Sequence, residues 1–137
     1  MGGELTIGRW IRDRARTSPQ RTAIEFLGTR ITYAELERRS RLLAAGLRAR
    51  GLARGDRVAT LTATSPDHVV ALFACARAGV ALVPLSWRLT PAELRHQLED
   101  AQPALLLVSA EHGRLAEEAG TAVTRMRLGD EALERDA

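Results

Sequence analysis

The spacing of apolar and polar residues alternates along the chain between two regular patterns. Short apolar runs predict buried strands, while apolar residues three or four positions apart predict amphipathic helices. The expected strands after the first third of the chain are 57–62, 80–84, 104–109 and 122–128, and the expected helices are 66–79, 90–100 and 110–119. Continuous apolar strands that alternate with helices indicate an α/β fold, with a mostly parallel sheet and flanking helices.

The first third of the chain predicts one hairpin between two helices. A helix is expected after Thr6, which can cap it. The apolar face of this helix consists of Ile7, Trp10, Ile11 and Ala15. Residues 22–27 and 30–32 predict two short antiparallel strands joined by a turn at residues 28–29. A second helix follows and ends at Gly51. Its apolar stripe consists of Leu36, Leu43, Ala44 and Leu47.

Capping signals mark the starts of three helices. Residues 32–35 and 90–93 each place a glutamate three positions after a threonine, the spacing of a capping box. Ser65 and Pro66 open a further helix, because serine caps a free N–H and proline suits the first helical position. The residues expected on the inward side of that helix are Val69, Val70, Phe73 and Ala76.

Length and composition are those of one globular domain. The chain has 137 residues, of which 45% are hydrophobic and 27% are charged. It contains no apolar run of roughly 18 residues and no recognisable secretory signal peptide. We therefore expect a cytoplasmic protein with no membrane span. Residues 1–128 are expected to form the domain, and the acidic residues 129–137 a tail or severed linker.

The basic residues of the chain are all arginines, 20 in number, and lysine is absent. The chain therefore offers no lysine amine as a phosphate clamp or nucleophile. Residues 1–57 hold 13 arginines and 6 acidic residues, whereas residues 58–137 hold 7 arginines and 11 acidic residues. Aromatic residues make up only 4% of the chain, which leaves few surfaces for stacking bases. No nucleic acid partner is expected.

Residues that often carry chemistry are few and scattered. His68, His96 and His112 lie far apart and accompany no cysteine pair, so we expect surface helix residues and no metal site. Cys75 lies on the inward side of its expected helix, which favours a core residue over a nucleophile. The sequence also contains no dinucleotide fingerprint and no Walker loop.

Four segments in order resemble stretches of a known family, and two of them, 31–36 and 76–85, resemble its first and second core motifs. The four segments are residues 31–36 (ITYAEL), 55–59 (GDRVA), 76–85 (ARAGVALVPL) and 86–94 (SWRLTPAEL). With their context they cover about residues 6–109 and are similar to the AMP-forming acyl-CoA synthetases of the adenylate-forming superfamily. The arginine and Leu-Thr-Pro after the third segment are closer to CoA ligases than to peptide-synthetase adenylation domains.

This resemblance implies a fold, a reaction and partners. The fold would be a partial N-terminal domain of the adenylate-forming fold. The parent enzyme would be a ligase that activates a carboxylic acid, expected to be a fatty acid, with ATP to acyl-AMP. It would then transfer the acyl group to the thiol of CoA, with Mg²⁺ as a further cofactor. The implied partners are the acid and the remainder of the adenylating enzyme, on the same or a separate chain.

The segment lacks the parts of the family that perform this chemistry. The phosphate loop with its lysine, the acidic residue near Mg²⁺, the ribose-binding aspartate and the catalytic lysine all come later in family members. Attack of a carboxylate on the α-phosphate joins two anions, so the reaction needs positive charge and a metal. We therefore expect the chain alone to be inactive, to bind no cofactor tightly, and to contain no catalytic or metal-binding residue.

Arg88 is the one candidate binding residue. It follows the strand expected at 80–84 and precedes the cap Thr90, so it lies at the carboxyl end of a parallel strand. The resemblance implies that it contacts a phosphate of the CoA nucleotide, which suits a forked guanidinium. The alternative is a surface arginine paired with Glu93 or a backbone carbonyl. The preceding residues, 86–87 (Ser-Trp), depart from the pair that the family usually has there.

A second class of function stays open. The alternative is a stand-alone, non-catalytic α/β binding or interaction module, or one half of a split enzyme completed by another chain. A homodimer is also open, because an exposed strand edge or apolar face favours association. A downstream phosphate loop with a lysine would favour the ligase, whereas a stop codon after Ala137 would favour the module.

Overall fold

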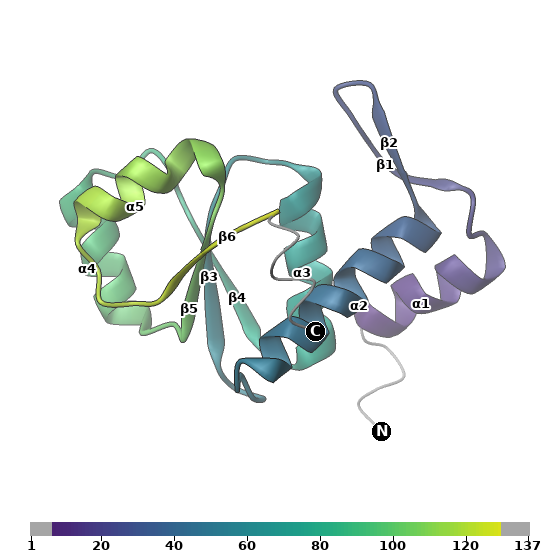
Figure 1. Ribbon diagram of the computed structural model, residues 1–137. Helices are drawn as coiled ribbons and strands as arrows, with labels where there is room; N and C mark the ends of the chain where they lie inside the picture. The colour runs from purple at the N-terminus through teal and green to yellow at the C-terminus, as the bar shows by residue number, and fades with distance from the viewer. Residues whose placement is uncertain (1–6, 130–137) are drawn as a thin grey trace.

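A parallel sheet between two layers of helices forms the body of the molecule, with a hairpin beside it (Figure 1). The computed structural model describes residues 7–129. The four strands of the sheet are β3 (Arg57–Leu61), β4 (Ala81–Leu85), β5 (Leu105–Val108) and β6 (Arg125–Arg127). They lie in the order β4-β3-β5-β6, and all neighbours are parallel. The predicted α/β class and parallel sheet are confirmed.

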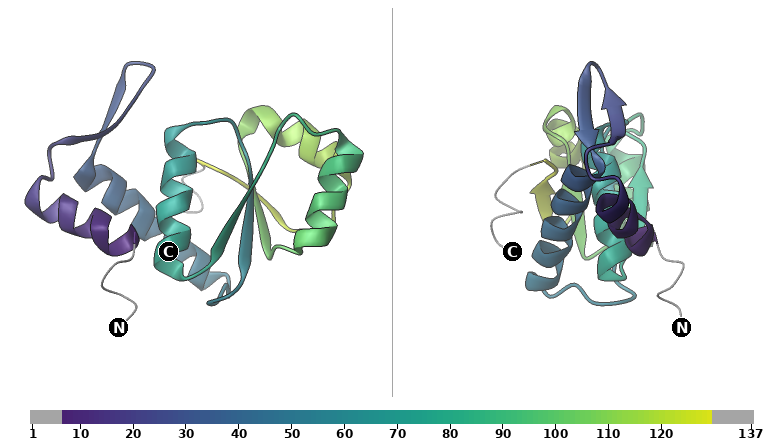
Figure 2. Two further views of the ribbon diagram at one scale, coloured as in Figure 1. Left: turned by 180° about the vertical axis from the view of Figure 1, so that it is seen from behind. Right: turned by 90° about the vertical axis from the view of Figure 1, so that its right-hand side faces the viewer.

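Helices cover both faces of this sheet (Figure 2). One layer consists of α2 (Tyr33–Ala49) and α3 (Pro66–Ala78), and α1 (Ile7–Thr17) packs against both of these helices. The other consists of α4 (Pro91–Ala101), the 3₁₀ turn η1 (Ala110–His112) and α5 (Gly113–Ala119). The single helix expected at 110–119 is thus divided at Gly113, and the strand expected at 122–128 is shortened to β6.

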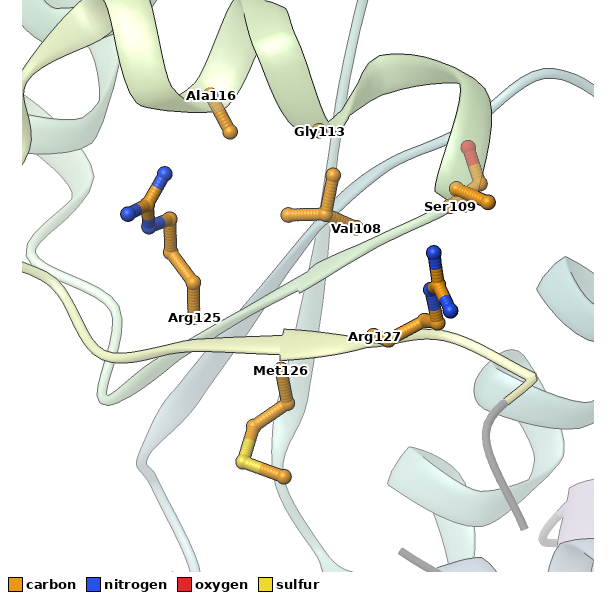
Figure 3. A pocket seen from close by; sticks show the side chains of 8 residues that line it. Val108, Ser109, Gly113, Ala116, Arg125, Met126 and Arg127 are labelled. Atoms are coloured by element: carbon orange, nitrogen blue, oxygen red, sulfur yellow. The ribbon is translucent and has the colours of Figure 1, made fainter. Parts of the chain in front are cut away.

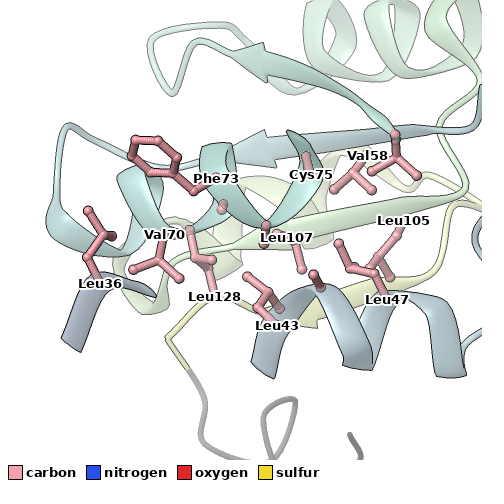
Figure 4. Close-up of a cluster of buried hydrophobic side chains, with 14 of the residues drawn as sticks. Leu36, Leu43, Leu47, Val58, Val70, Phe73, Cys75, Leu105, Leu107 and Leu128 are labelled. Atoms are coloured by element: carbon pink, nitrogen blue, oxygen red, sulfur yellow. The ribbon is translucent and has the colours of Figure 1, made fainter. Parts of the chain in front are cut away.

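The two central strands send alternate side chains into two hydrophobic clusters. Leu105 and Leu107 of β5 join the cluster beneath α2 and α3 (Figure 4), whereas Leu106 and Val108 join the cluster beneath α4 and α5. All four of these residues are buried. A strand buried on both faces needs apolar side chains at every position, so the continuous run in the sequence predicted this strand well.

The strand β4 lies at an edge of the sheet, and its five apolar residues are covered unevenly. Ala81 and Pro84 are exposed, and only Leu85 is buried. Proline has no backbone N–H, so it is tolerated in a sheet mainly at an edge, where no outer strand requires that hydrogen bond. Pro84 therefore fits the position that β4 occupies in the sheet.

The buried side of α1 differs from the predicted apolar face. Gly8 and Ile11 are buried, whereas Ile7 and Trp10 are 47% and 51% exposed. A Cβ atom at Gly8 would lie 3.0 Å from Cγ of Arg77, so α1 approaches α3 closely at a glycine. This close approach places Ile7 and Trp10 at the rim of the contact. The predicted cap Thr6 lies outside the described residues, as do residues 130–137 of the expected tail.

The buried side of α3 is also broader than predicted. Val70 and Phe73 are buried as expected, but Val69 and Ala76 are only half-buried. The other buried residues of α3 are Ala71, Ala74 and Cys75. The reason is that α3 packs against α2 as well as against the sheet, so two sides of the helix are covered.

The predicted hairpin is confirmed, with its turn one residue earlier than expected. Strands β1 (Thr22–Phe26) and β2 (Thr29–Thr32) are antiparallel. Between them, Leu27 and Gly28 have φ angles of 50° and 83°. Two successive positive φ angles are those of a type I′ turn, whose twist matches that of the two strands.

Only half of the capping box predicted at the start of α2 forms. The Thr32 hydroxyl accepts a hydrogen bond from the Glu35 N–H at 3.1 Å, so the threonine caps the helix as expected. The Glu35 carboxylate instead binds the Arg38 guanidinium at 2.7 Å. This bond lowers the pKa of Glu35 below its ordinary value. An arginine one turn along the helix thus competes successfully for the carboxylate.

Candidate functional site

The loop that follows β4 lies at the carboxyl edge of the parallel sheet, where α/β proteins commonly bind ligands. Both ends of this loop are fixed by hydrogen bonds. The Arg88 N–H donates to Oγ of Ser86 at 3.1 Å. Thr90 and Glu93 form the predicted capping box of α4. The Glu93 N–H donates to Oγ1 of Thr90 at 3.2 Å, and the Thr90 N–H donates to Oε1 of Glu93 at 3.0 Å. The loop therefore presents Trp87 and Arg88 from a fixed backbone.

Arg88 is exposed and rests on an aromatic ring. Its guanidinium carbon lies 5.0 Å from the centre of the Trp87 ring. The predicted alternative partner, Glu93, is bound to the Thr90 N–H instead. Among residues 7–129, none of the ion pairs involves Arg88. The guanidinium donors of Arg88 are thus available to an anion from outside the described part of the chain.

Trp87 in turn stacks on a histidine from another loop. The Trp87 and His112 rings are nearly parallel, with an angle of 12° and a distance of 5.5 Å between their centres. His112 ends η1, which follows β5. Because β3 lies between β4 and β5, this contact bridges the carboxyl end of a third strand. The expectation that His112 is a free surface residue is wrong, and sequence reasoning missed the Trp87–His112 pair.

A hollow of about 290 Å³ lies at the same edge, between β6 and the start of α5. Its walls include Val108, Ser109 and Gly113. Figure 3 shows Arg125 and Arg127 on the α5 side of β6, where both border the hollow. The sequence reasoning missed this hollow, although the alternation Arg-Met-Arg at 125–127 is the pattern of a strand with one polar face.

A larger hollow of about 690 Å³ lies at the opposite edge of the sheet. It is bordered by Gln102, Pro103 and Ala104, just before β5, and by Thr121 and Thr124, before β6. These residues precede the amino ends of their strands. We place the candidate site at the carboxyl edge because that edge also holds the exposed guanidinium of Arg88 and the stacked rings.

Two of the remaining candidate residues, His68 and Cys75, serve the packing of the core, and the third, His96, does not. Nε2 of His68 lies 3.3 Å from the hydroxyl of the buried Thr60, and burial lowers the pKa of this histidine. His68 is half-buried, so the surface position predicted for it is wrong, while His96 is exposed as expected. Cys75 is 1% exposed and burial raises the pKa of its thiol to about 12, in agreement with a core role.

The described residues do not fit a magnesium site. Within residues 7–129, no group of three or more histidine, cysteine, aspartate or glutamate side chains is placed to hold a metal ion. Mg²⁺ prefers oxygen ligands from carboxylates and phosphates, and these residues form no such group of three or more carboxylates. The same residues include no helix that is both long and apolar enough to cross a membrane.

Comparison with known proteins gives a consistent result. The family described as "AMP-binding enzyme" matches residues 11–136. Feruloyl-CoA synthase from Amycolatopsis sp. is 48% identical over 106 residues, which are 77% of this chain and 22% of that protein. Fatty acid–[acyl-carrier-protein] ligase ScoC from Streptomyces coeruleorubidus is 42% identical over 103 residues, 75% of this chain and 20% of that protein.

Solved structures share the fold. One of them is O-succinylbenzoate coenzyme A synthetase from Bacillus subtilis, in complex with ATP and magnesium ion, with a TM-score of 0.80 and 30% sequence identity. The match covers 93% of this chain and 34% of the synthetase chain. The chain thus spans about a fifth of the length of its curated relatives and a third of this structure. The matching regions carry the fold predicted for the N-terminal domain of adenylate-forming enzymes. The chain therefore belongs to the AMP-binding enzyme family, whose adenylate-forming ligases it resembles in both sequence and fold.

Proposed function

We propose that this chain is a segment of an AMP-forming acid–thiol ligase. The enzyme joins a carboxylic acid to ATP, which gives acyl-AMP and pyrophosphate, and then passes the acyl group to a thiol, with release of AMP. The thiol is that of CoA, and Mg²⁺ accompanies the ATP. The family match over residues 11–136 is the observation that carries the proposal.

The acid is defined here only as a carboxylic acid, with a fatty acid as the first candidate. The names of similar proteins include ferulate, indoleacetate, 2-succinylbenzoate and fatty acid. Relatives of this segment thus differ widely in their acids. One of these proteins delivers its acyl group to an acyl carrier protein according to its name, so a carrier-protein thiol is the second candidate acceptor.

Within this enzyme, Arg88 binds a phosphate of the CoA nucleotide. Three observations support the proposal: the guanidinium is exposed, it is bound to none of the described carboxylates, and it lies at the carboxyl edge of the sheet. A planar guanidinium offers paired donors to phosphate oxygens, which gives it an advantage over a point charge.

The segment itself performs no chemistry in this proposal. It has no lysine, and its described part holds no group of three or more side chains placed for a metal ion, so it lacks the lysine and the metal site that would offset the charge of two reacting anions. We expect the purified 137-residue chain to show no acid-dependent exchange of pyrophosphate into ATP. Exchange above a buffer blank that survives repurification would overturn this part of the proposal.

The role of Arg88 is tested in the gene product that carries residues 1–137. We expect Arg88→Ala to raise KM for CoA about tenfold, because loss of one charged phosphate contact weakens binding by about 1–2 kcal/mol. Acyl-AMP formation, measured by pyrophosphate exchange with a panel of fatty and aromatic acids, should stay unchanged. Arg30→Ala, on the exposed hairpin, is the matched control.

The two half-reactions distinguish the outcomes. If pyrophosphate exchange and CoA-dependent turnover fall together in Arg88→Ala, the residue is structural. If neither changes, Arg88 has no role in binding CoA. If the gene product shows no exchange with any acid and ends at Ala137, the stand-alone module or the split enzyme replaces the proposed ligase.

A further inference from the structure

The stack of Trp87 on His112 gives Arg88 a fixed support. Trp87 is 43% exposed, so an unsupported indole at this place would be free to change rotamer. Its nearly parallel contact with His112 restricts that freedom. The backbone N–H of His112 donates to the carbonyl of Ser109 at 3.1 Å, which holds the histidine close to the end of β5.

The geometry of Arg88 leaves its donors usable while the side chain is restrained. A guanidinium over an aromatic ring is attracted through its flat face, whereas its N–H groups point outward in the guanidinium plane. A distance of 5.0 Å from the ring centre lies within the range of this attraction. Restraint before binding reduces the conformational entropy that a long side chain loses when it captures a ligand.

We propose that Trp87 and His112 are positioning residues that hold Arg88 ready for a phosphate group of CoA, an inference that rests on the function proposed above for Arg88. Neither residue needs to touch the ligand. Trp87 acts through the guanidinium, and His112 acts through Trp87. The three residues come from the loop after β4 and from η1, so they also tie two loops together over the carboxyl end of β3.

The kinetic test uses the gene product that carries residues 1–137. We expect Trp87→Leu to raise KM for CoA about threefold, the size of one exposed cation–π contact, with kcat unchanged. Trp87→Phe keeps an aromatic face and should restore most of the affinity, and His112→Leu should resemble Trp87→Leu. Trp10→Leu is the matched control, because Trp10 packs against Tyr33 and Phe73 and not against Arg88.

A second measurement reports the stack directly. In the 137-residue chain, the Trp87 ring current should shift the NMR signals of the Arg88 side chain upfield, and Trp87→Leu should abolish that shift. Tryptophan fluorescence adds a readout in the gene product. CoA should alter the emission there, and Trp87→Phe should remove the part of that change that comes from Trp87, while pantetheine, which lacks the nucleotide phosphates, should not cause it.

The outcomes separate this inference from the proposed function. If Arg88→Ala raises KM for CoA and Trp87→Leu does not, the positioning role is overturned and the role of Arg88 stands. If neither variant raises KM, both are overturned, even where the NMR shift shows that the stack exists. If Trp87→Phe is as impaired as Trp87→Leu, the aromatic face is not what holds Arg88, and the inference fails.

Discussion

Arg77 of α3 and Glu37 of α2 form an ion pair between two packed helices, with only 17% and 16% of their side chains exposed. The backbone carbonyl of Arg77 also accepts a hydrogen bond from the Arg48 guanidinium at 2.6 Å. A second pair, Arg39 with Asp67 at 2.7 Å, joins the same two helices and is more exposed. Charged contacts thus fix the position of α3, which begins next to the sheet's carboxyl edge.

Removal of one partner of the buried pair Glu37–Arg77 should lower the free energy of unfolding strongly. In Glu37→Ala the Arg77 guanidinium keeps its burial but loses its carboxylate, so the free energy of unfolding should fall by about 3 kcal/mol. The double variant Glu37→Leu with Arg77→Leu removes both charges and should lose much less. Urea denaturation of the 137-residue chain measures both values. A double variant that is as unstable as Glu37→Ala would contradict this account.

The more exposed pair provides the comparison. Asp67→Ala should lower the free energy of unfolding by at most about 1 kcal/mol, because water screens a half-exposed pair. A loss as large as that of Glu37→Ala would show that burial does not set the difference between the two pairs.

The half-buried His68 should make stability depend on pH. Burial lowers its folded-state pKa, so the unfolded chain binds a proton more readily than the folded chain. The contribution of the neutral His68 to the free energy of unfolding is therefore complete above the unfolded-state pKa of about 6.5. It is lost as pH falls through the folded-state pKa. We expect His68→Gln to reduce the slope of unfolding free energy against pH between about pH 5 and 7. The exposed His96→Gln variant should keep the wild-type slope.

The capping box of α4 can be tested through both of its partners. Thr90→Ala should lower the free energy of unfolding by about 1 kcal/mol, while Thr90→Ser should keep most of it. Hydrogen bonds from the backbone and side chain of Thr90 lower the pKa of Glu93. The backbone N–H of Thr90 remains in Thr90→Ala, so that pKa should rise only part of the way toward its ordinary value in an NMR titration. An ordinary pKa for Glu93 in the wild-type chain would show that the box does not persist in solution.

The thiol of Cys75 should report the opening of the core. Burial raises its pKa to about 12, so almost no thiolate exists near pH 8, and the sulfur is covered by its neighbours. We expect a disulfide reagent to react with the native chain many times more slowly than with the urea-unfolded chain. The native rate should increase in Glu37→Ala in proportion to its loss of stability. Rapid reaction of the native chain would exclude the core role.

Local patterns in the sequence predicted most of the elements and their order. All four residues of β5 are apolar, as a strand with helices on both faces of the sheet requires. The caps at Ser65 and Thr90 act through hydrogen bonds within a stretch of four residues. Contacts of this kind depend on nearby residues alone. The hairpin turn was misplaced by one residue because Leu27, which lacks the usual preference for positive φ, occupies its first position.

Features that depend on distant residues could not be predicted in this way. The exposed position of Trp10 follows from the approach of Gly8 to Arg77, far along the chain. At the candidate site, the sequence placed Arg88 in its loop correctly but gave no sign that His112 supports Trp87. Pro84 was a local signal left unused, since a proline within a strand indicates an edge.

Among residues 7–129, the two outer strands of the sheet are protected from pairing with another strand by different means. On β4, Pro84 removes a backbone donor permanently, whatever the solvent. On β6, protection comes from the charges of Arg125 and Arg127, which would face those of another copy across an antiparallel pair. Salt screens such repulsion, whereas it cannot restore a missing N–H. Raised ionic strength should therefore weaken the protection of β6 and leave that of β4 unchanged.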